Sequence, residues 1–394
     1  MKKNFKETTV TILFLLLLFY FSATTIFSNH SEIQSVLSEK LLTVQDKIAA
    51  IDNIFNTKLT NFDNLLNLYS LTQKALNTSL YDDIEYGFII RDNHDSLHFP
   101  YYVVDTKPCA EKTIRLYENL KELGTPFLYI QAPNKKLKNY TVYPVGGHNY
   151  SNEDADQFLE QLQQNNVPYL DLRKSIEQGQ LDKSDLFYKT DHHWTTETAF
   201  YGYTKIAETL NQTFHLPLSE KYTNRQNYAS VTYPHSFLGS LGRRIGKYAV
   251  GIDDYTFFYP KFETNYEIYF SPDPTTEPAF SGDFMTAIAK ENLLSSTNIK
   301  DNKYASYFEY EYGNLVVKNK LADNHLKILM IKDSFSLPVA AFLSTAVEEL
   351  HMIDLRYPGA PNPYEYAKGH HFDLVMVLYN THVFDISNFH FINE

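Results

Sequence analysis

The chain has 394 residues, of which 43% are hydrophobic, and it carries a formal net charge of -12. This length accommodates one large domain or two small ones, and the acidic balance argues against nucleic acid as a partner, because no basic stripe is available to neutralise phosphates. The single cysteine, Cys109, excludes an intrachain disulfide and is interpreted as a packing residue.

Residues 1–28 predict a membrane segment. Lys2, Lys3 and Lys6 precede a largely apolar run from Val10 to Phe27, which is long enough to cross a bilayer as a helix. The basic flank predicts that the N-terminus stays in the cytoplasm. A cleaved signal peptide is the alternative, but no clear small-x-small cleavage site follows the run, so we favour a retained signal anchor. Under either interpretation the remaining chain lies outside the cytoplasm.

Residues 29–82 are expected to form a helical stalk. Apolar residues recur there mostly at spacings of three and four, with Glu, Lys and Gln between them. Asn29 or Ser31 is suited to cap the start. The segment is either an extended stalk or a helical hairpin that docks on the following domain, and coiled-coil dimerisation is a further alternative.

Residues 83–394 are expected to form one α/β domain. Strands are expected at 84–90, 97–104, 126–131, 167–172, 325–331, 350–355 and 373–379, and helices at 110–123, 153–165, 195–210 and 338–350. This alternation predicts a parallel sheet with helices on both faces, a three-layer arrangement. From about 211 to 324 the pattern changes to short aromatic segments between loops. That stretch is interpreted as an aromatic-rich insertion with small β elements, covering one edge of the sheet.

The stretch from Phe187 to Thr195 combines a carboxylate, two imidazoles and the only tryptophan of the chain, before a predicted helix. Asp191 and His193 are two residues apart, so a turn can bring their side chains together. A carboxylate that holds one imidazole nitrogen leaves the other free to act as a base. Trp194 is interpreted as a packing anchor for this loop.

Ser334 lies where a predicted strand gives way to a helix. Such a connection exposes a side chain at the carboxyl edge of a parallel sheet, and the N–H groups of the helix start would stabilise an oxyanion. The alternative is that Ser334 only satisfies a turn and Asp333 caps the helix. Asp191, His193 and Ser334 together provide the orienter, base and nucleophile that acyl transfer requires.

We expect no metal and no other cofactor. Adjacent histidines are expected to point in different directions, and no cysteine cluster accompanies them. Three histidine pairs invite a metal interpretation: His192 with His193, His370 with His371, and His94 with His98.

The stretch 187–195 resembles the Asp-x-His-Trp motif of the SGNH-hydrolase-like polysaccharide O-acetyltransferases, the group that includes the alginate acetylation proteins. The doubled histidine is most similar to the DHHW family. The resemblance continues at Ala132–Lys135 with Tyr143-Pro144, at Phe237–Leu241 and at Lys332–Ser336, and it covers most of residues 85–394. It implies an SGNH-like fold in which Ser334 matches the nucleophile, His193 the base and Asp191 the orienter of that base.

One departure concerns the nucleophile turn, where Lys332 replaces the first residue of the familiar Gly-Asp-Ser. The oxyanion hole is therefore less well defined, with the Ser334 N–H as its first candidate donor. Asn380, Gly239 and Arg243 are further candidates for oxyanion or substrate contacts.

The resemblance implies an extracytoplasmic, membrane-anchored O-acetyltransferase that acts on a cell-envelope or secreted polysaccharide, with the acyl group supplied by a membrane-bound O-acyltransferase. The aromatic insertion is expected to provide the acceptor groove. Two alternatives stay open: an esterase with the same three residues, and a non-catalytic glycan-binding or assembly protein. The polysaccharide, the hydroxyl, the donor and the oligomeric state are not predicted.

Overall fold

The structure is a computed structural model that describes residues 2–270, 277–308 and 312–393. It separates the chain into two units, Met1–Ala75 and Leu76–Glu394, each of which is described by itself.

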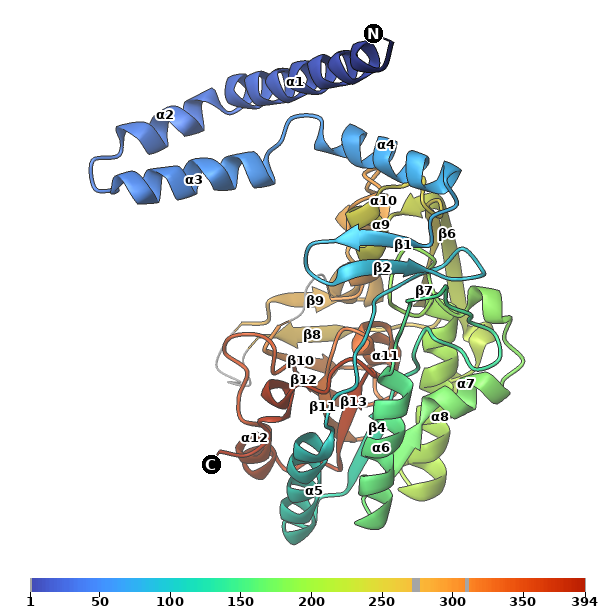
Figure 1. The fold of residues 1–394 in the computed structure, drawn as a ribbon. Coiled ribbons are helices and arrows are strands. Elements are labelled where there is room, and N and C mark those ends of the chain that lie inside the picture. Colours follow the sequence, from blue (N-terminus) through green and yellow to red (C-terminus); the bar gives the residue numbers. More distant parts are fainter. Residues whose placement is uncertain (1, 271–276, 309–311, 394) are drawn as a thin grey trace. The chain divides into compact units, whose positions relative to one another are not determined.

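The first unit is helical (Figure 1). Its four helices are α1 (Lys2–Ser28), α2 (His30–Ser38), α3 (Val44–Thr57) and α4 (Phe62–Ala75). The predicted continuous stripe is broken between α2 and α3, where Thr43 starts a new helix by exchanging two hydrogen bonds with Asp46. A salt bridge from Lys58 to Glu32 links the end of α3 back to α2 at 2.6 Å. The unit therefore contains a helical hairpin.

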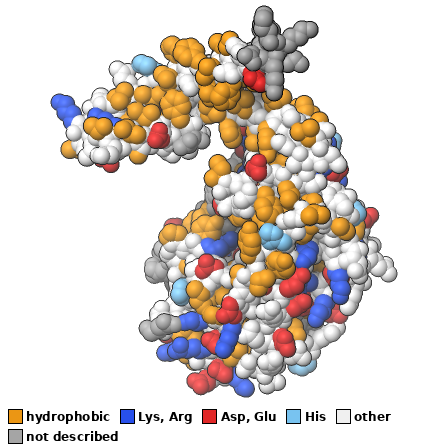
Figure 2. All heavy atoms as spheres, in the orientation of Figure 1, with side chains coloured by type: hydrophobic (Ala, Val, Ile, Leu, Met, Phe, Trp, Pro, Cys, Tyr) orange, Lys and Arg blue, Asp and Glu red, His pale blue; other side chains and the backbone are white. Residues whose placement is uncertain are grey.

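Helix α1 is apolar for most of its length, and Figure 2 shows hydrophobic side chains gathered along the helices of this unit. Residues Glu7–Ser28 are long and apolar enough to span a membrane. A signal sequence near the N-terminus has the same length and composition, so this helix fits both the predicted anchor and the cleaved alternative.

The second unit is organised around an eight-stranded mixed sheet. Its parallel part consists of five neighbouring strands with the order β5 (Tyr169–Asp171), β4 (Phe127–Gln131), β13 (Leu374–Tyr379), β11 (Lys327–Lys332) and β12 (Glu349–Ile353). All six residues of β13 are buried, as expected for a strand covered on both faces.

Helices cover both faces of the parallel strands. One hydrophobic cluster joins Leu329 and Ile331 of β11 to α5 (Lys107–Glu122), α6 (Ser151–Gln164) and α12 (Pro363–His370). The alternate residues Ile328 and Met330 face α7 (Leu172–Gln178), α8 (Thr196–Thr213) and α11 (Ser336–Leu343). The predicted three-layer α/β fold is confirmed.

The insertion extends the sheet rather than only covering its edge. Three of its strands continue the sheet beyond β12, each antiparallel to the strand before it, in the order β10 (Asn314–Asn319), β8 (Tyr266–Tyr269) and β9 (Phe280–Gly282). The rest includes a hairpin of β6 (Tyr228–Phe237) and β7 (Asp253–Pro260), with the short helices α9 (Ser240–Ile245) and α10 (Glu291–Ser295). Residues 271–276 and 309–311 of the insertion lie outside the described residues.

Two predicted segments differ in detail. The region expected to hold strands at 84–90 and 97–104 forms a small separate sheet of β1 (Leu80–Asp83), β2 (Gly87–Arg91) and β3 (Leu97–His98), with Ile84 exposed in the first turn. The helix expected at 338–350 begins earlier and ends at Leu343, because the chain turns there to enter β12.

Candidate active site

The loop between Phe187 and Thr195 is closed by its own backbone. A β-bridge joins Phe187 to Trp194, and the Tyr188 N–H donates to the His193 carbonyl. Thr195 then caps α8 by accepting from the Thr198 N–H. The loop therefore presents Asp191 and His193 from a fixed turn immediately before a helix.

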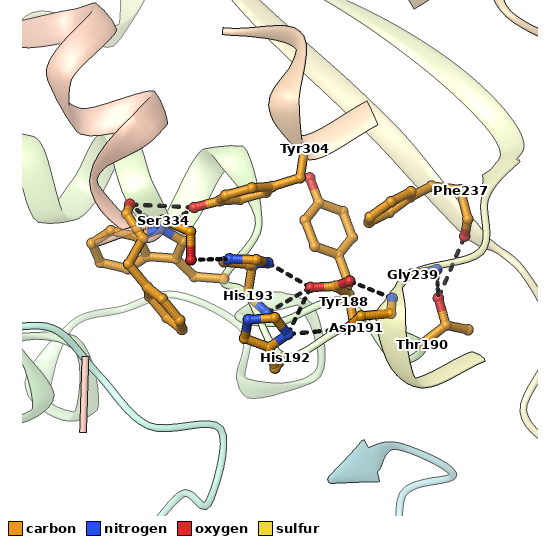
Figure 3. Close-up of polar contacts among 12 residues, drawn as sticks. Tyr188, Thr190, Asp191, His192, His193, Phe237, Gly239, Tyr304 and Ser334 are labelled. Carbon is orange, nitrogen blue, oxygen red and sulfur yellow. Dashed lines mark hydrogen bonds and ion pairs between the residues drawn. The ribbon is translucent and has the colours of Figure 1, made fainter. Parts of the chain in front are cut away.

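Asp191, His193 and Ser334 form a continuous chain of hydrogen bonds (Figure 3). His193 Nδ1 lies 2.6 Å from Asp191 Oδ1, and His193 Nε2 lies 2.8 Å from Ser334 Oγ. The His193 backbone N–H also donates to Asp191 Oδ1 at 3.0 Å, which explains why a spacing of two residues suffices. Asp191 and His193 are buried, whereas Ser334 is partly exposed, so Ser334 is the residue of the three that is open to solvent.

Asp191 is held as a carboxylate. Burial alone would raise its pKa, but the adjacent imidazoles of His192 and His193 outweigh that effect and keep the pKa well below its ordinary value. The carboxylate oxygen accepts from the N–H at Nδ1 of His193, which leaves Nε2 as the nitrogen that can accept the Ser334 hydroxyl proton.

The backbone of the α9 entrance packs directly against Asp191. The Ser240 N–H donates to Asp191 Oδ2 at 2.6 Å, and the Gly239 N–H donates to Thr190 Oγ1 at 2.8 Å. A Cβ added at Gly239 would lie 2.3 Å from Asp191 Cβ and 2.5 Å from Asp191 Oδ2. Gly239, predicted as an oxyanion or substrate contact, therefore lies behind Asp191 and fixes its position.

The buried side chain of Lys135 supports the same loop. Its Nζ donates to the carbonyl oxygens of Tyr188, Lys189 and Asp191 at 2.5, 3.1 and 2.7 Å. Burial lowers the pKa of Lys135 to about 8. Three loop carbonyls are thus satisfied by one side chain, which explains how an irregular segment is tolerated in the interior.

Tyr304, in the short helix Lys303–Ser306, provides a flat support for the base. Its ring stacks on His193 with centroids 3.9 Å apart and planes within 15°. Trp194 Nε1 donates to the Tyr304 hydroxyl and to the Phe335 carbonyl, at 3.0 and 3.1 Å. Trp194 is fully buried, so it anchors the loop as predicted. Tyr304 was not singled out in the sequence.

The turn that holds Ser334 is shaped by Asp333. The two oxygens of the Asp333 carboxylate accept from the Phe335 N–H and from both the backbone and side-chain N–H groups of Asn380, at 2.6 to 2.9 Å. Burial raises the pKa of Asp333 to about 6. Asn380, predicted as an oxyanion donor, is thus placed beside the nucleophile turn, with its amide nitrogen directed at Asp333.

The side chain of the unusual Lys332 is held by Asp354. Its Nζ forms a buried salt bridge with Asp354 at 3.0 Å, and Arg356 also binds Asp354. Lys332 therefore ties β11 to the end of β12. Among the described residues, none accepts a hydrogen bond from the Ser334 N–H, which leaves this group available as an oxyanion donor.

His192 lies closer to His193 than expected. The two rings are 3.9 Å apart, and ligand atoms of Asp191, His192 and His193 lie within 4.8 Å of one another. The expectation that adjacent histidines point in different directions is therefore wrong here, because both rings turn toward the Asp191 carboxylate. His192 Nδ1 lies 3.0 Å from Ser240 Oγ, and burial, followed by the adjacent His193 ring, lowers the pKa of His192 to about 3.

The other predicted residues take structural contacts. Arg243 donates to the Lys300 carbonyl at 2.8 Å. His98 lies 2.9 Å from Asp92, whereas His94 stacks on Tyr140. His370 Nδ1 lies 2.8 Å from the Tyr366 carbonyl. Most of the described aromatic side chains of the insertion are buried in the core, among them Tyr255, Phe257, Phe258, Tyr266, Phe284, Tyr304 and Tyr307; that the insertion provides an acceptor groove stays a prediction.

Residues 109–251 match the family described as SGNH hydrolase-like domain, acetyltransferase AlgX. The matched segment includes Asp191 and His193 and ends before Ser334. The resemblance predicted from the sequence is confirmed. No curated protein matches the chain.

Two solved structures share the fold. PatB1 from Bacillus cereus, solved with a sulfonyl adduct, is 20% identical, covers 78% of this chain and 98% of its own, and superposes with a TM-score of 0.62. A DHHW family protein from Eubacterium siraeum is 14% identical, covers 77% of this chain and 94% of its own, and has a TM-score of 0.59.

Proposed function

We propose that this protein transfers acetyl groups to hydroxyl groups of a cell-envelope or secreted polysaccharide, through an acyl ester on Ser334. The observation that carries the proposal is the hydrogen-bond chain from Asp191 through His193 to the side chain of the partly exposed residue Ser334. The match of residues 109–251 to an acetyltransferase domain supports the choice of acyl group.

The first half-reaction acylates Ser334. His193 Nε2 accepts the hydroxyl proton as Ser334 Oγ attacks the carbonyl carbon of the acetyl donor. The Ser334 N–H stabilises the negative oxygen that forms. The bond to the leaving group then breaks, His193 returns the proton to that group, and an ester remains on Ser334.

The second half-reaction repeats these steps with a sugar. His193 takes the proton of a sugar hydroxyl, whose oxygen attacks the ester carbonyl. The bond to Ser334 Oγ breaks, the proton returns to that oxygen, and the acetyl group leaves on the sugar. The charge of Asp191 stabilises the imidazolium in both halves.

We place the reaction outside the cytoplasm, with α1 as the membrane anchor. The basic residues before the apolar run support this orientation. The donor would come from a membrane-bound O-acyltransferase that exports the acyl group, as the resemblance to alginate acetylation proteins implies.

The test uses full-length protein in detergent with 4-nitrophenyl acetate, with and without an oligosaccharide. We expect acetylated sugar by mass spectrometry, and acetylation of Ser334 in protein quenched before the acceptor is added. Ser334→Ala should abolish both. A sulfonyl fluoride should modify Ser334 and block turnover, by analogy with the adduct of PatB1.

Two results would contradict the proposal. Ester hydrolysis that the oligosaccharide does not diminish, with no acetylated sugar, would identify an esterase, because water reaches the partly exposed Ser334. A wild-type level of cell-surface acetylation in a Ser334→Ala strain would instead favour a non-catalytic glycan-binding role.

A further inference from the structure

A hollow of about 380 Å³ opens beside the carboxyl end of β13. This volume falls in the range of small-molecule sites, about 300 to 1,000 Å³. The hollow belongs to neither the Asp191–His193 loop nor the Ser334 turn. Its lining includes Tyr101, Tyr102, Asp154, Thr381, His382 and Asp385.

The hollow adjoins the candidate active site through two contacts. Asn380, which binds Asp333 next to Ser334, also accepts the His382 N–H on its side-chain oxygen at 2.6 Å. On the other side, the ring of Phe99 lies 6.2 Å from Tyr101 and 5.7 Å from His192. The hollow is therefore linked to the Ser334 turn through Asn380 and to the ring of His192 through Phe99.

Tyr101 and His382 form a rigid aromatic pair in this lining. Their rings are stacked with centroids 3.6 Å apart and planes within 10°. The backbone of Tyr101 is fixed by a bridge to Asn149 and by hydrogen bonds with His148 and Tyr150. The neighbouring Tyr102 is 65% exposed. The pair thus offers a preorganised apolar surface beside solvent.

His382 also contacts Asn134. Asn134 Oδ1 accepts from the Lys136 N–H at 2.6 Å, so the amide nitrogen of Asn134 is the atom 2.8 Å from His382 Nε2. The same nitrogen lies 2.7 Å from Ser151 Oγ and 2.6 Å from Thr381 Oγ1, so its two hydrogens are shared among three partners. Burial, followed by the nearby His192, lowers the pKa of His382 well below its ordinary value. No described residue is hydrogen-bonded to Nδ1 of His382.

The charged groups of the hollow are acidic. Asp154 is 2% exposed, and its Oδ1 has no hydrogen-bond partner among the described residues. Asp385 is exposed, and the described lining contains neither lysine nor arginine. Unpaired carboxylate oxygens bind hydroxyl or amine donors and repel another carboxylate.

We infer that this hollow binds a pyranose unit of the acceptor polysaccharide, one without an acidic group, against the Tyr101–His382 pair. The apolar face of the sugar packs on the aromatic surface, and its hydroxyl or amine groups meet His382 Nδ1 and Asp154. This subsite rests on the proposed function, since the bound unit would position a neighbouring hydroxyl at Ser334. It deepens that function by naming the class of acceptor.

The test measures binding without turnover. Full-length Ser334→Ala protein in detergent is titrated by calorimetry with tetrasaccharides of glucosamine, N-acetylglucosamine and galacturonic acid. We expect the first two to bind at least tenfold more tightly than the third. In this background Tyr101→Ala and His382→Ala should each weaken binding at least tenfold. Tyr101→Phe and the control Tyr248→Ala, an exposed tyrosine outside the hollow, should bind within twofold of the parent.

The inference is overturned if galacturonate binds as well as the others, if none of the three binds, or if folded Tyr101→Ala and His382→Ala proteins retain full affinity. Failure of the proposed function looks different. Selective binding that depends on Tyr101, without acetylation of Ser334, would keep the subsite and reject the transferase. Acetyl transfer in which Tyr101→Ala and His382→Ala keep the wild-type KM for the acceptor would keep the transferase and reject the subsite.

Discussion

Gly239→Ala provides a sharp test of how Asp191 is held. The backbone of Gly239 has φ of -67°, which any residue adopts, so the effect of the added methyl group is purely steric. That methyl carbon would lie 2.3 Å from Asp191 Cβ. Carbon atoms in contact prefer about 3.5 Å or more, so Asp191 or the α9 entrance must move by roughly 1 Å.

The hydrogen bond between Asp191 and His193 is 2.6 Å long, and a shift of this size would weaken or break it. A misplacement of about 1 Å in a catalytic arrangement can reduce the rate about 100-fold. We therefore expect kcat for 4-nitrophenyl acetate to fall about 100-fold with little change in KM. Overpacking should also lower the free energy of unfolding by about 1–3 kcal/mol.

The matched control is Gly369→Ala in α12. No atom lies within 4 Å of the added methyl group, and the position is helical and exposed. This variant should keep wild-type kcat and gain about 0.5–1 kcal/mol of stability. Steady-state kinetics and urea unfolding of the three proteins provide the comparison. A Gly239→Ala protein with wild-type kcat would refute the view that Gly239 positions Asp191.

Three further predictions concern other parts of the chain. Asp191→Asn should lower kcat by about 10⁴. The pKa of Asp191 is lowered in the folded state, so the stability that its ionised form contributes is complete above about pH 4 and is lost as the pH falls through the folded pKa. The difference in unfolding free energy between wild type and Asp191→Asn should therefore shrink on acidification. A constant difference would argue against an ionised Asp191. Tyr304→Phe keeps the ring against His193, so kcat should change less than threefold while the free energy of unfolding falls by about 1 kcal/mol. Tyr304→Leu removes the ring and should lower kcat at least tenfold more than Tyr304→Phe. Equal kcat values for the two variants would show that the stacked ring does not matter. Intact mass measured on protein from membranes should include residues 1–28 if α1 is a retained anchor, whereas a mass lacking them would identify a cleaved signal.

The sequence predicted those features that depend on short spacings or on regular alternation. Asp191 and His193 meet because one turn joins them, and the strand-to-helix change at Ser334 places that residue at the edge of the sheet. The alternation of buried strands and amphipathic helices likewise predicted the three layers. These signals are local, so they can be read from the sequence without knowing which segments become neighbours in the fold.

The missed features of the candidate site and of the insertion arise from contacts between distant segments. Tyr304 and Tyr101 are two of 31 tyrosines, and nothing near them in sequence indicates that one stacks on His193 and the other on His382. The insertion joins the sheet through β10, whose partner β12 comes later in the chain. His192 turns toward Asp191 because Ser240, also distant in sequence, binds its ring.

The unequal exposure of the hydrogen-bond chain has a consequence for the order of events. Asp191 and His193 are buried, and only the Ser334 end opens to solvent. If the proposed transfer occurs, donor and acceptor must approach the same oxygen from the same side. The donor and the acceptor therefore cannot bind at the same time, and the product of the first half-reaction must leave before the acceptor binds. Double-reciprocal plots at several acceptor concentrations should be parallel, and excess acceptor should slow the first half-reaction by occupying the entrance.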